Sequence, residues 1–250
     1  MELDLTFFLF AVPAVLFAGI SKGGFAAGPA FAASPFLALV IEPQLAVGVM
    51  LPLLIVADVA AMRGFWRQWN WKNARALMIG AVPGIILGAL LFKYMNADFL
   101  RLLIGAISIG FVLFQGARKY GLIHKTERPF NAAKAMFWGG VAGFTSFVSH
   151  AGGPPASVHL LSQRLSKTEY QATTVLTFWC INLVKVIPYA MIGMFTRETL
   201  VANVYLAPVA FIGAFIGIYL HRVISERLFF TLAYVFLLMT GAKLIFDALT

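Results

Sequence analysis

The first residue that could do chemistry is a lysine in a glycine-rich stretch, GISKGGFAAGP, at residues 19–29. Lys22 is the only ionisable side chain between Asp4 and Glu42, so one positive charge stands alone in a long apolar run. Glycine and proline oppose an unbroken helix and leave backbone N–H groups without helical partners. Such N–H groups at a helix start, beside a lysine, attract anions. The stretch therefore predicts an anion-binding site.

A second stretch, SHAGGPPAS at residues 149–157, has a similar composition. His150 stands near the place that Lys22 has in the first stretch, and Ser149 takes the place of Ser21. An imidazole titrates near neutral pH, so His150 could change charge while it serves the site; the alternative is a hydrogen-bonded structural histidine. Two such stretches, if they face each other, would enclose a small oxyanion.

Two further charges, Asp58 and Lys185, lie inside apolar segments of membrane-spanning length. A charge at that depth costs about 3 kcal/mol unless it is paired, hydrated or functional. Two interpretations stay open: a structural Asp58–Lys185 ion pair, or a site in which Lys185 attracts the anion and Asp58 tunes it or carries a proton. Asn182 lies one turn before Lys185 and faces the same way. We expect the substrate to be bound by Ser21, Lys22, Gly23, Gly24, Gly28, Ser149, His150, Gly152, Gly153, Asn182 and Lys185, with Asp58 as a coupling or structural charge.

Other kinds of chemistry have little support in the sequence. The single cysteine, Cys180, excludes an internal disulfide, and no cluster of cysteine and histidine suggests a metal. The chain has no HExxH or Walker A pattern, so we expect neither an enzyme nor a cofactor.

The composition indicates what must position these residues. The chain of 250 residues is 61% hydrophobic and 12% charged, whereas a soluble domain is about 25% charged. Apolar stretches long enough to cross a bilayer recur from end to end. We therefore expect one all-α polytopic domain in the lipid bilayer. The net charge of +9 fits cytoplasmic loops rich in Lys and Arg better than a nucleic-acid partner.

Ten apolar segments can be read along the chain. They run over residues 5–20, 24–41, 44–62, 74–93, 97–116, 132–149, 152–163, 168–195, 199–221 and 226–247. Segment 152–163 is too short to cross a bilayer as a straight helix, and segment 24–41 is interrupted by glycine and proline. We expect the first two segments of each half to form a broken or re-entrant helix pair, followed by three transmembrane helices.

The two halves of the chain resemble each other in the order of their motifs. A glycine-proline stretch comes first in each, and a GxxxG pair follows at Gly84/Gly88 and again at Gly213/Gly217. We expect a first repeat at 1–117, a cytoplasmic linker at 118–131 and a second repeat at 132–250. An odd number of crossings in each half makes the repeats inverted, which is a recurrent transporter architecture with the site at the repeat interface.

The positions of Lys and Arg favour an orientation. The positive-inside rule is satisfied best when both termini lie outside and the loops 63–75, 118–134, 164–167 and 222–227 lie inside. A rival topology with eight helices, in which the first pair of each half is fused into one crossing, gives a smaller asymmetry.

The GxxKGGFxxGP pattern at 19–29, its degenerate copy at 149–157 and the two-half organisation resemble the sulfite exporter TauE/SafE family over nearly the whole chain. The resemblance implies a secondary transporter of the bacterial cytoplasmic membrane that exports sulfite, sulfoacetate or another organosulfonate by alternating access. A passive anion channel and a transporter of a non-sulfur organic anion are the alternatives. Coupling to protons or sodium, and a homodimer, are left open.

Overall fold

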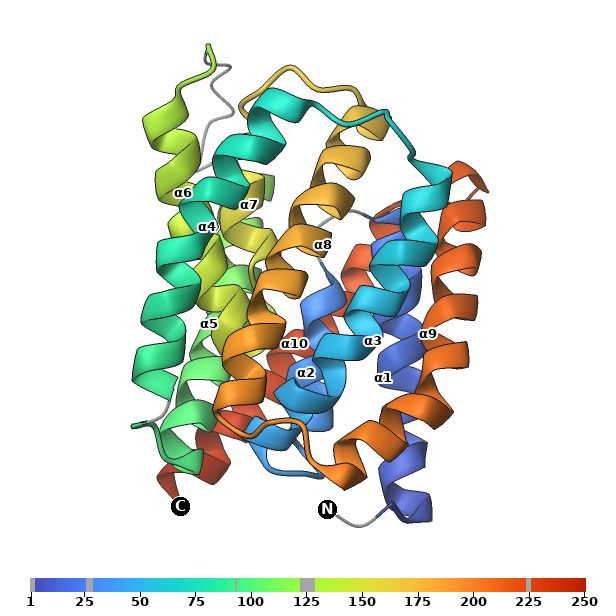
Figure 1. Ribbon diagram of the computed structural model, residues 1–250, viewed down its shortest axis with the longest axis vertical. Coiled ribbons are helices and arrows are strands. Elements are labelled where there is room, and N and C mark those ends of the chain that lie inside the picture. The colour runs from blue at the N-terminus through green and yellow to red at the C-terminus, as the bar shows by residue number, and fades with distance from the viewer. Residues whose placement is uncertain (1–2, 26–28, 93, 122–128, 224–225) are drawn as a thin grey trace.

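The computed structural model describes residues 3–25, 29–92, 94–121, 129–223 and 226–250. All the regular structure in these residues is helical, and the long helices stand side by side in a bundle (Figure 1). The elements are α1 (Leu5–Gly24), the 3₁₀ turn η1 (Pro29–Ala32), α2 (Ala33–Leu37), α3 (Pro43–Gly64), α4 (Trp71–Phe92), α5 (Ala97–Lys119), α6 (Ala132–Ser149), α7 (Gly153–Leu160), α8 (Lys167–Met191), α9 (Arg197–Val223) and α10 (Glu226–Leu249).

Each predicted interruption coincides with the end of a long helix. Helix α1 ends at Gly24 and is followed by the short elements η1 and α2. Helix α6 ends at Ser149, the next residue, His150, has a left-handed φ of 58°, and the short α7 begins at Gly153. A left-handed conformation is costly for a residue with a Cβ atom, so the surrounding packing must hold His150 in place.

Close helix packing relies on glycine. Helix α4 packs along α6, and α9 packs along α1. A Cβ atom on Gly84 of α4 would lie 2.0 Å from the carbonyl oxygen of Gly140, and one on Gly23 of α1 would lie 2.0 Å from that of Ala214. Glycine is needed at both positions because the two backbones touch there. The remaining long helices pair as α5 with α10 and α3 with α8.

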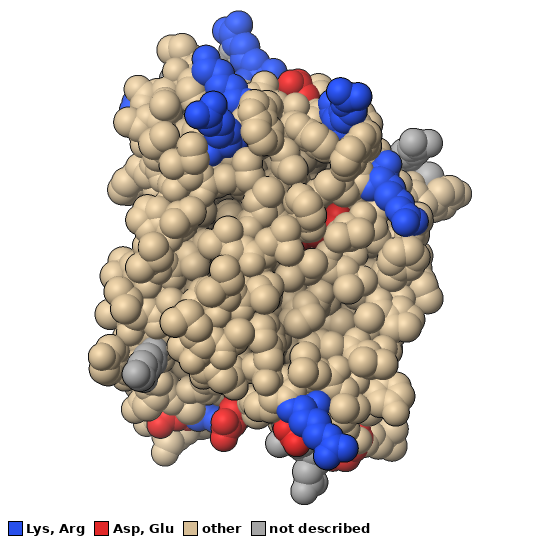
Figure 2. All heavy atoms as spheres, in the orientation of Figure 1, with Lys and Arg blue, Asp and Glu red and all other residues tan. Residues whose placement is uncertain are grey.

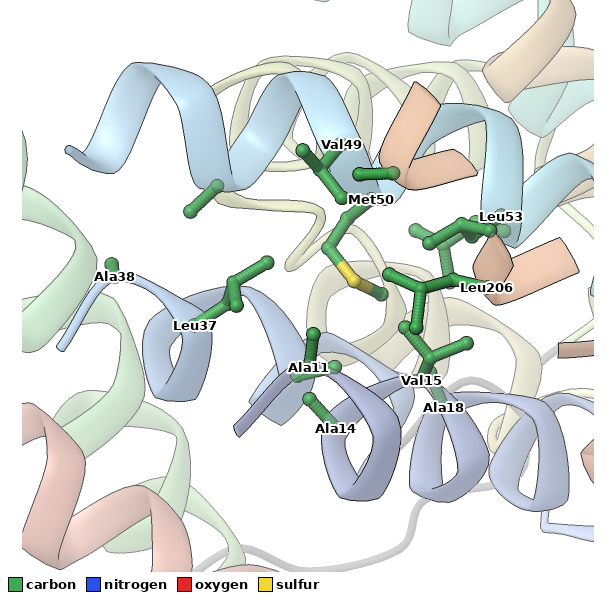
Figure 3. Close-up of a cluster of buried hydrophobic side chains, with 14 of the residues drawn as sticks. Ala11, Ala14, Val15, Ala18, Leu37, Ala38, Val49, Met50, Leu53 and Leu206 are labelled. Atoms are coloured by element: carbon green, nitrogen blue, oxygen red, sulfur yellow. The ribbon is translucent and has the colours of Figure 1, made fainter. Parts of the chain in front are cut away.

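A buried apolar cluster joins α1, α2, α3 and α9 at one side of the bundle (Figure 3). Helix α1 contributes the small residues Ala11, Ala14 and Ala18, which let Met50 of α3 pack close to it. The cluster fixes α1 and α3 against each other, and these are the helices that carry Lys22 and Asp58.

The outer surface matches a lipid environment. Figure 2 shows a broad belt with almost no Lys, Arg, Asp or Glu between two ends that carry the charges. Large apolar side chains are exposed in this belt, among them Leu90 at 62%, Ile187 at 67% and Val204 at 73%. In the described residues, six helices are long and apolar enough to cross a membrane: α1, α3, α4, α5, α8 and α9. The protein is a multi-pass membrane protein.

Candidate functional site

Polar side chains from four helices meet inside the bundle. They are Lys22 of α1, Asp58 of α3, His150 at the end of α6, and Asn182 and Lys185 of α8. Asp58 and Lys185 are completely buried, and Asn182 and His150 are 2% and 7% exposed. The sequence placed Asp58 and Lys185 inside apolar segments, and both are buried.

Asp58 forms an ion pair with Lys22. The Lys22 Nζ atom donates to Asp58 Oδ1 at 2.7 Å, and Asn182 Nδ2 donates to Asp58 Oδ2 at 2.8 Å. Both carboxylate oxygens are thus held, one by a cation and one by a neutral amide. The alternative of an Asp58–Lys185 ion pair is wrong, because the carboxylate reaches the lysine at the end of α1 instead.

Lys185 is bound by neutral groups. Its Nζ atom donates to His150 Nδ1 at 2.8 Å, and to the carbonyl and hydroxyl oxygens of Ser146 at 2.8 and 3.0 Å. Three acceptors match the three protons of an ammonium group. His150 Nε2 lies 2.9 Å from the carbonyl oxygen of Val47, which can only accept. The ring therefore carries its proton on Nε2, leaves Nδ1 free to accept, and is uncharged.

The two interactions correspond between the halves of the chain. In each, a residue at the end of a broken helix binds a residue on the next long helix: Lys22 of α1 binds Asp58 of α3, and His150 after α6 binds Lys185 of α8. The first interaction contains a cation and an anion, and the second contains a cation and a neutral ring. Three acceptors around Nζ fit a protonated Lys185, and with that charge the cluster of these four residues holds one positive charge in excess.

A cavity of about 20 Å³ lies beside this cluster, which is space for about one water molecule. It is lined by Lys22, Ala30, Phe31, Leu54, Ser146, His150, Gly153, Thr174, Val175, Phe178 and Asn182. Within the described part of the chain, the buried hydroxyl of Thr174 has no hydrogen-bond partner. The Phe178 ring lies below Lys22, whose Nζ atom is 5.5 Å from the ring centroid. Lys185 stands behind Ser146 and His150.

One helix begins at the cavity and another ends near it, so the two helix dipoles present opposite signs there. Helix α7 begins at the cavity with Gly153 and then Pro154 and Pro155. Proline has no N–H group, so the first turn of α7 offers the Gly153 N–H and the positive end of the helix dipole, not a set of donors.

Helix α1 instead ends near the cavity, and its last carbonyl groups are capped by side chains. Gln171 Nε2 donates to the Lys22 carbonyl oxygen at 2.8 Å, and His221 Nδ1 donates to that of Gly24 at 2.6 Å. These bonds satisfy the helix end. They hold the backbone of Lys22 fixed while its side chain extends into the site.

Several expected binding residues lie outside the lining of the cavity. The backbones of Gly23 and Gly24 face α9, where a Cβ atom would lie 2.0 and 2.3 Å from carbonyl oxygens. Gly152 packs against the Phe178 ring, 2.5 Å from where its Cβ atom would be. The Ser149 hydroxyl donates to the carbonyl oxygen of Thr145 at 3.3 Å.

The Ser21 hydroxyl is buried and has no hydrogen-bond partner among the residues that the structure describes. Gly28 lies outside the described residues. A binding role for Gly28, as for Ser21, Ser149, Gly23, Gly24 and Gly152, stays a prediction.

Three contributors at the site were not anticipated from the sequence. The carbonyl group of Val47 orients His150, Ser146 binds Lys185, and Thr174 lines the cavity. Ser146 stands one helical turn before His150, so its spacing could have predicted that the two residues lie on the same side of the helix. The role of a backbone carbonyl group such as that of Val47 cannot be predicted from the sequence, because every residue type has the same carbonyl group.

Comparisons with known proteins identify the family of this chain. Residues 11–244 match the family described as sulfite exporter TauE/SafE. A probable sulfite/organosulfonate exporter TauE from Cupriavidus necator is 24% identical over 187 residues, which cover 71% of this chain and 69% of that protein. No solved structure matches the chain. Because the family match spans nearly the whole bundle, the chain belongs to the sulfite exporter TauE/SafE family.

Proposed function

We propose that the protein is a secondary transporter that exports sulfite, sulfoacetate or another organosulfonate across the bacterial cytoplasmic membrane by alternating access. The observation that carries this proposal is the buried cluster of Lys22, Asp58, His150 and Lys185, which has one cation in excess. An unpaired charge inside a bilayer is costly, and intramembrane ionisable groups mark substrate pathways. The sulfite or sulfonate group of the substrate would bring the negative charge that balances the cluster.

The correspondence between the halves indicates where that anion would sit. In the first half, the Asp58 carboxylate lies against Lys22. In the second half no carboxylate takes part in the hydrogen bonds of Lys185 that the structure describes. The substrate would supply the missing acid. Its oxygens would meet the Lys22 ammonium, the Thr174 hydroxyl and the Gly153 N–H, all of which line the cavity, with Lys185 adding charge from behind.

The packing of the bundle supports two inverted repeats. Helix α4 lies on α6 as α9 lies on α1, and the pairs α3/α8 and α5/α10 join counterparts from the two halves. Both ends of the chain lie at the same end of the bundle (Figure 1). The opposite end carries mostly Lys and Arg (Figure 2), which supports placing that end in the cytoplasm. Two rigid halves rocking about the central site would give alternating access.

Asp58 provides a means of coupling to protons. Its carboxylate and a substrate anion compete for the same ammonium group of Lys22. Protonation of Asp58 would release Lys22 for the substrate, and departure of the substrate would favour loss of that proton. We therefore propose that a proton on Asp58 accompanies the bound anion.

The experiment that tests the function is counterflow in proteoliposomes. Purified protein is reconstituted in vesicles loaded with unlabelled sulfite, and the uptake of radiolabelled sulfite is followed without oxygen. We expect a transient accumulation above equilibrium, because a carrier exchanges one bound anion for another. Protein with Lys185→Met is the matched negative control.

Each alternative gives a distinct result. A passive channel equilibrates the label without any transient accumulation. Malonate that drives counterflow as well as sulfite and sulfoacetate do would assign the protein to non-sulfur organic anions. No exchange of any of these anions, in protein shown to be folded by its thermal unfolding, contradicts the proposal.

A further inference from the structure

A polar groove opens at the end of the bundle that is rich in Lys and Arg, away from the central cavity. It has two connected parts of about 570 and 340 Å³, which share Pro129, Phe130 and Gln163 in their walls. The rest of the lining comes from Asn70, Lys72, Asn73, Asn131, Lys134, His159, Ser162, Arg164 and Leu165. The α3–α4 connection, the start of α6 and the α7–α8 connection thus form its walls.

The groove is positively charged. Lys72, Lys134 and Arg164 are all exposed and line it, and no Asp or Glu is among the described lining residues. The Lys72 Nζ atom lies 4.4 Å from the centroid of the Phe130 ring, so this cation is held over the groove by an aromatic face. Helices α4 and α6 begin at the groove, which adds the positive ends of two dipoles. Together these features attract small anions.

The floor of the groove is a fixed hydrogen-bonded chain. His159 Nε2 donates to Asn73 Oδ1 at 2.7 Å, and Asn73 Nδ2 donates to Asn70 Oδ1 at 3.0 Å. His159 and Asn73 are both buried, at 4% exposed each. A buried network of this kind holds its members in one arrangement. The cations at the rim therefore stand over a rigid polar surface, not over a freely moving loop.

Helix α7 connects the groove with the central site. Its first residue, Gly153, lines the central cavity, and His159 near its last residue lines the groove. The central cavity has space for about one water molecule, whereas the groove can hold a whole organosulfonate. An anion arriving at this end would meet the groove first.

We propose that the groove is a second anion-binding site, which takes sulfite or a small sulfonate from the cytoplasm before the central site opens. The nature of the ligand rests on the proposed function. The site itself rests on the groove and on the exposed Lys72 and Lys134 that line it, and none of its residues belongs to the central cluster.

The test combines binding with transport. Sulfoacetate binding to purified protein is measured by calorimetry, at low ionic strength, in a zwitterionic detergent. We expect two binding events in the wild type. The paired change Lys72→Gln with Lys134→Gln should remove the weaker event and keep the stronger, while Lys185→Met should do the reverse.

In inside-out vesicles, the Lys72→Gln/Lys134→Gln protein should need about fivefold more sulfoacetate for half-maximal uptake, because two exposed charges are lost. The maximal rate should be unchanged, since the central site is intact. Arg63→Gln with Arg75→Gln is the matched control: it removes two exposed cations at the same end that do not line the groove. An equal effect of the two paired changes would overturn the proposal and leave only a diffuse surface charge.

Anionic lipid headgroups are the competing occupant. Phosphatidylglycerol added to the wild type should leave both binding events in place, as phosphatidylcholine does. Loss of the weaker event with phosphatidylglycerol alone would assign the groove to lipid and overturn the proposal. Failure of the proposed transport function would give a different result. Counterflow would then be absent, while the binding event that Lys72→Gln with Lys134→Gln removes would still be seen by calorimetry.

Discussion

Lys185 is a buried ammonium group whose protons all go to neutral acceptors, on Ser146 and His150. Such an arrangement satisfies every hydrogen bond and leaves the charge unbalanced. Structural ion pairs are not built this way, since each buried charge requires an opposite one. A charge that is hydrogen-bonded and yet uncompensated suits a site that waits for an ion from outside.

Lys185→Met should separate charge from packing. We expect sulfite affinity to fall about 10-fold to 150-fold, since a hydrogen bond involving a charged group contributes roughly 1.5–3 kcal/mol. The unfolding temperature in detergent should be equal to the wild-type value or higher, because an uncompensated buried charge is removed. Calorimetry and thermal unfolding measure the two effects. Lys243→Met, at an exposed position of α10, is the control and should change neither.

Neutralising one partner of the Lys22–Asp58 ion pair should lower the stability of the fold, unlike neutralising Lys185. Asp58→Asn leaves the Lys22 ammonium without its anion, and breaking a buried pair costs about 3–5 kcal/mol. We expect a lower unfolding temperature for Asp58→Asn, and recovery of most of the loss when Lys22→Met is added. A double-mutant cycle of thermal unfolding gives the coupling energy. Additive effects of the two changes would mean that the residues do not interact.

Asp58→Asn also tests the coupling to protons. An asparagine cannot release a proton, so exchange of substrate for substrate should continue while uphill transport driven by a pH gradient is lost. Vesicles with and without an imposed gradient separate these activities. Gradient-driven accumulation that persists in Asp58→Asn protein would assign the coupling to another group.

At the scale of single residues, the sequence indicated which polar groups lie deep in apolar segments but not how they pair. Lys22, Asp58, His150, Asn182 and Lys185 were all singled out, because charges and amides are conspicuous in apolar segments. The partner of Asp58 was not predictable, since Asp58 and Lys22 are 36 residues apart. Their contact depends on how far α1 extends beyond its expected end at residue 20, to Gly24.

At the scale of helices, close packing at glycine decides stability. Gly84→Ala should lower the unfolding temperature, because the new Cβ atom would lie 2.0 Å from the Gly140 carbonyl oxygen and α4 and α6 would have to separate. Gly23→Ala should do the same at the α1–α9 contact. Gly110→Ala is the matched control, because no atom lies within 4 Å of its Cβ position.

Gly23→Ala distinguishes helix packing from ligand binding at the first glycine stretch. If Gly23 serves only the α1–α9 contact, the fraction of protein that remains folded should bind sulfite with wild-type affinity. Weaker binding in a protein of unchanged stability would instead show that the ligand approaches this backbone.

The helices themselves follow from the sequence more closely than the site does. Apolar segments of spanning length predicted the long helices to within a few residues, because a helix satisfies all its backbone hydrogen bonds within one apolar segment. The expected broken segments 24–41 and 152–163 became α2 and α7 with their flanking turns. The sequence pattern could not decide the role of Gly23 and Gly24, because glycine in a membrane helix can serve either helix packing or ligand binding.

At the scale of the whole molecule, the distribution of charge predicts the orientation. Single cysteines are placed in a Cys180→Ser background and treated with a membrane-impermeant reagent in intact cells. Cysteines at Lys72 and Lys167 should be protected, and cysteines at Glu198 and Thr250, at the other end of the bundle, should react. If the cysteine at position 167 reacts while the one at position 72 is protected, the two positions lie on opposite sides of the membrane. That result would contradict the inverted arrangement, which places both in the cytoplasm.

The small central cavity has a consequence for the energy supply of the cell. A bacterial membrane stores its proton gradient only as long as no continuous water path crosses it. A space of about one water molecule, lined by Phe31, Leu54 and Phe178, is too small to hold a chain of waters. We therefore expect the protein without substrate to conduct few protons, so that an exporter of the proposed kind could be abundant in the membrane without draining the gradient.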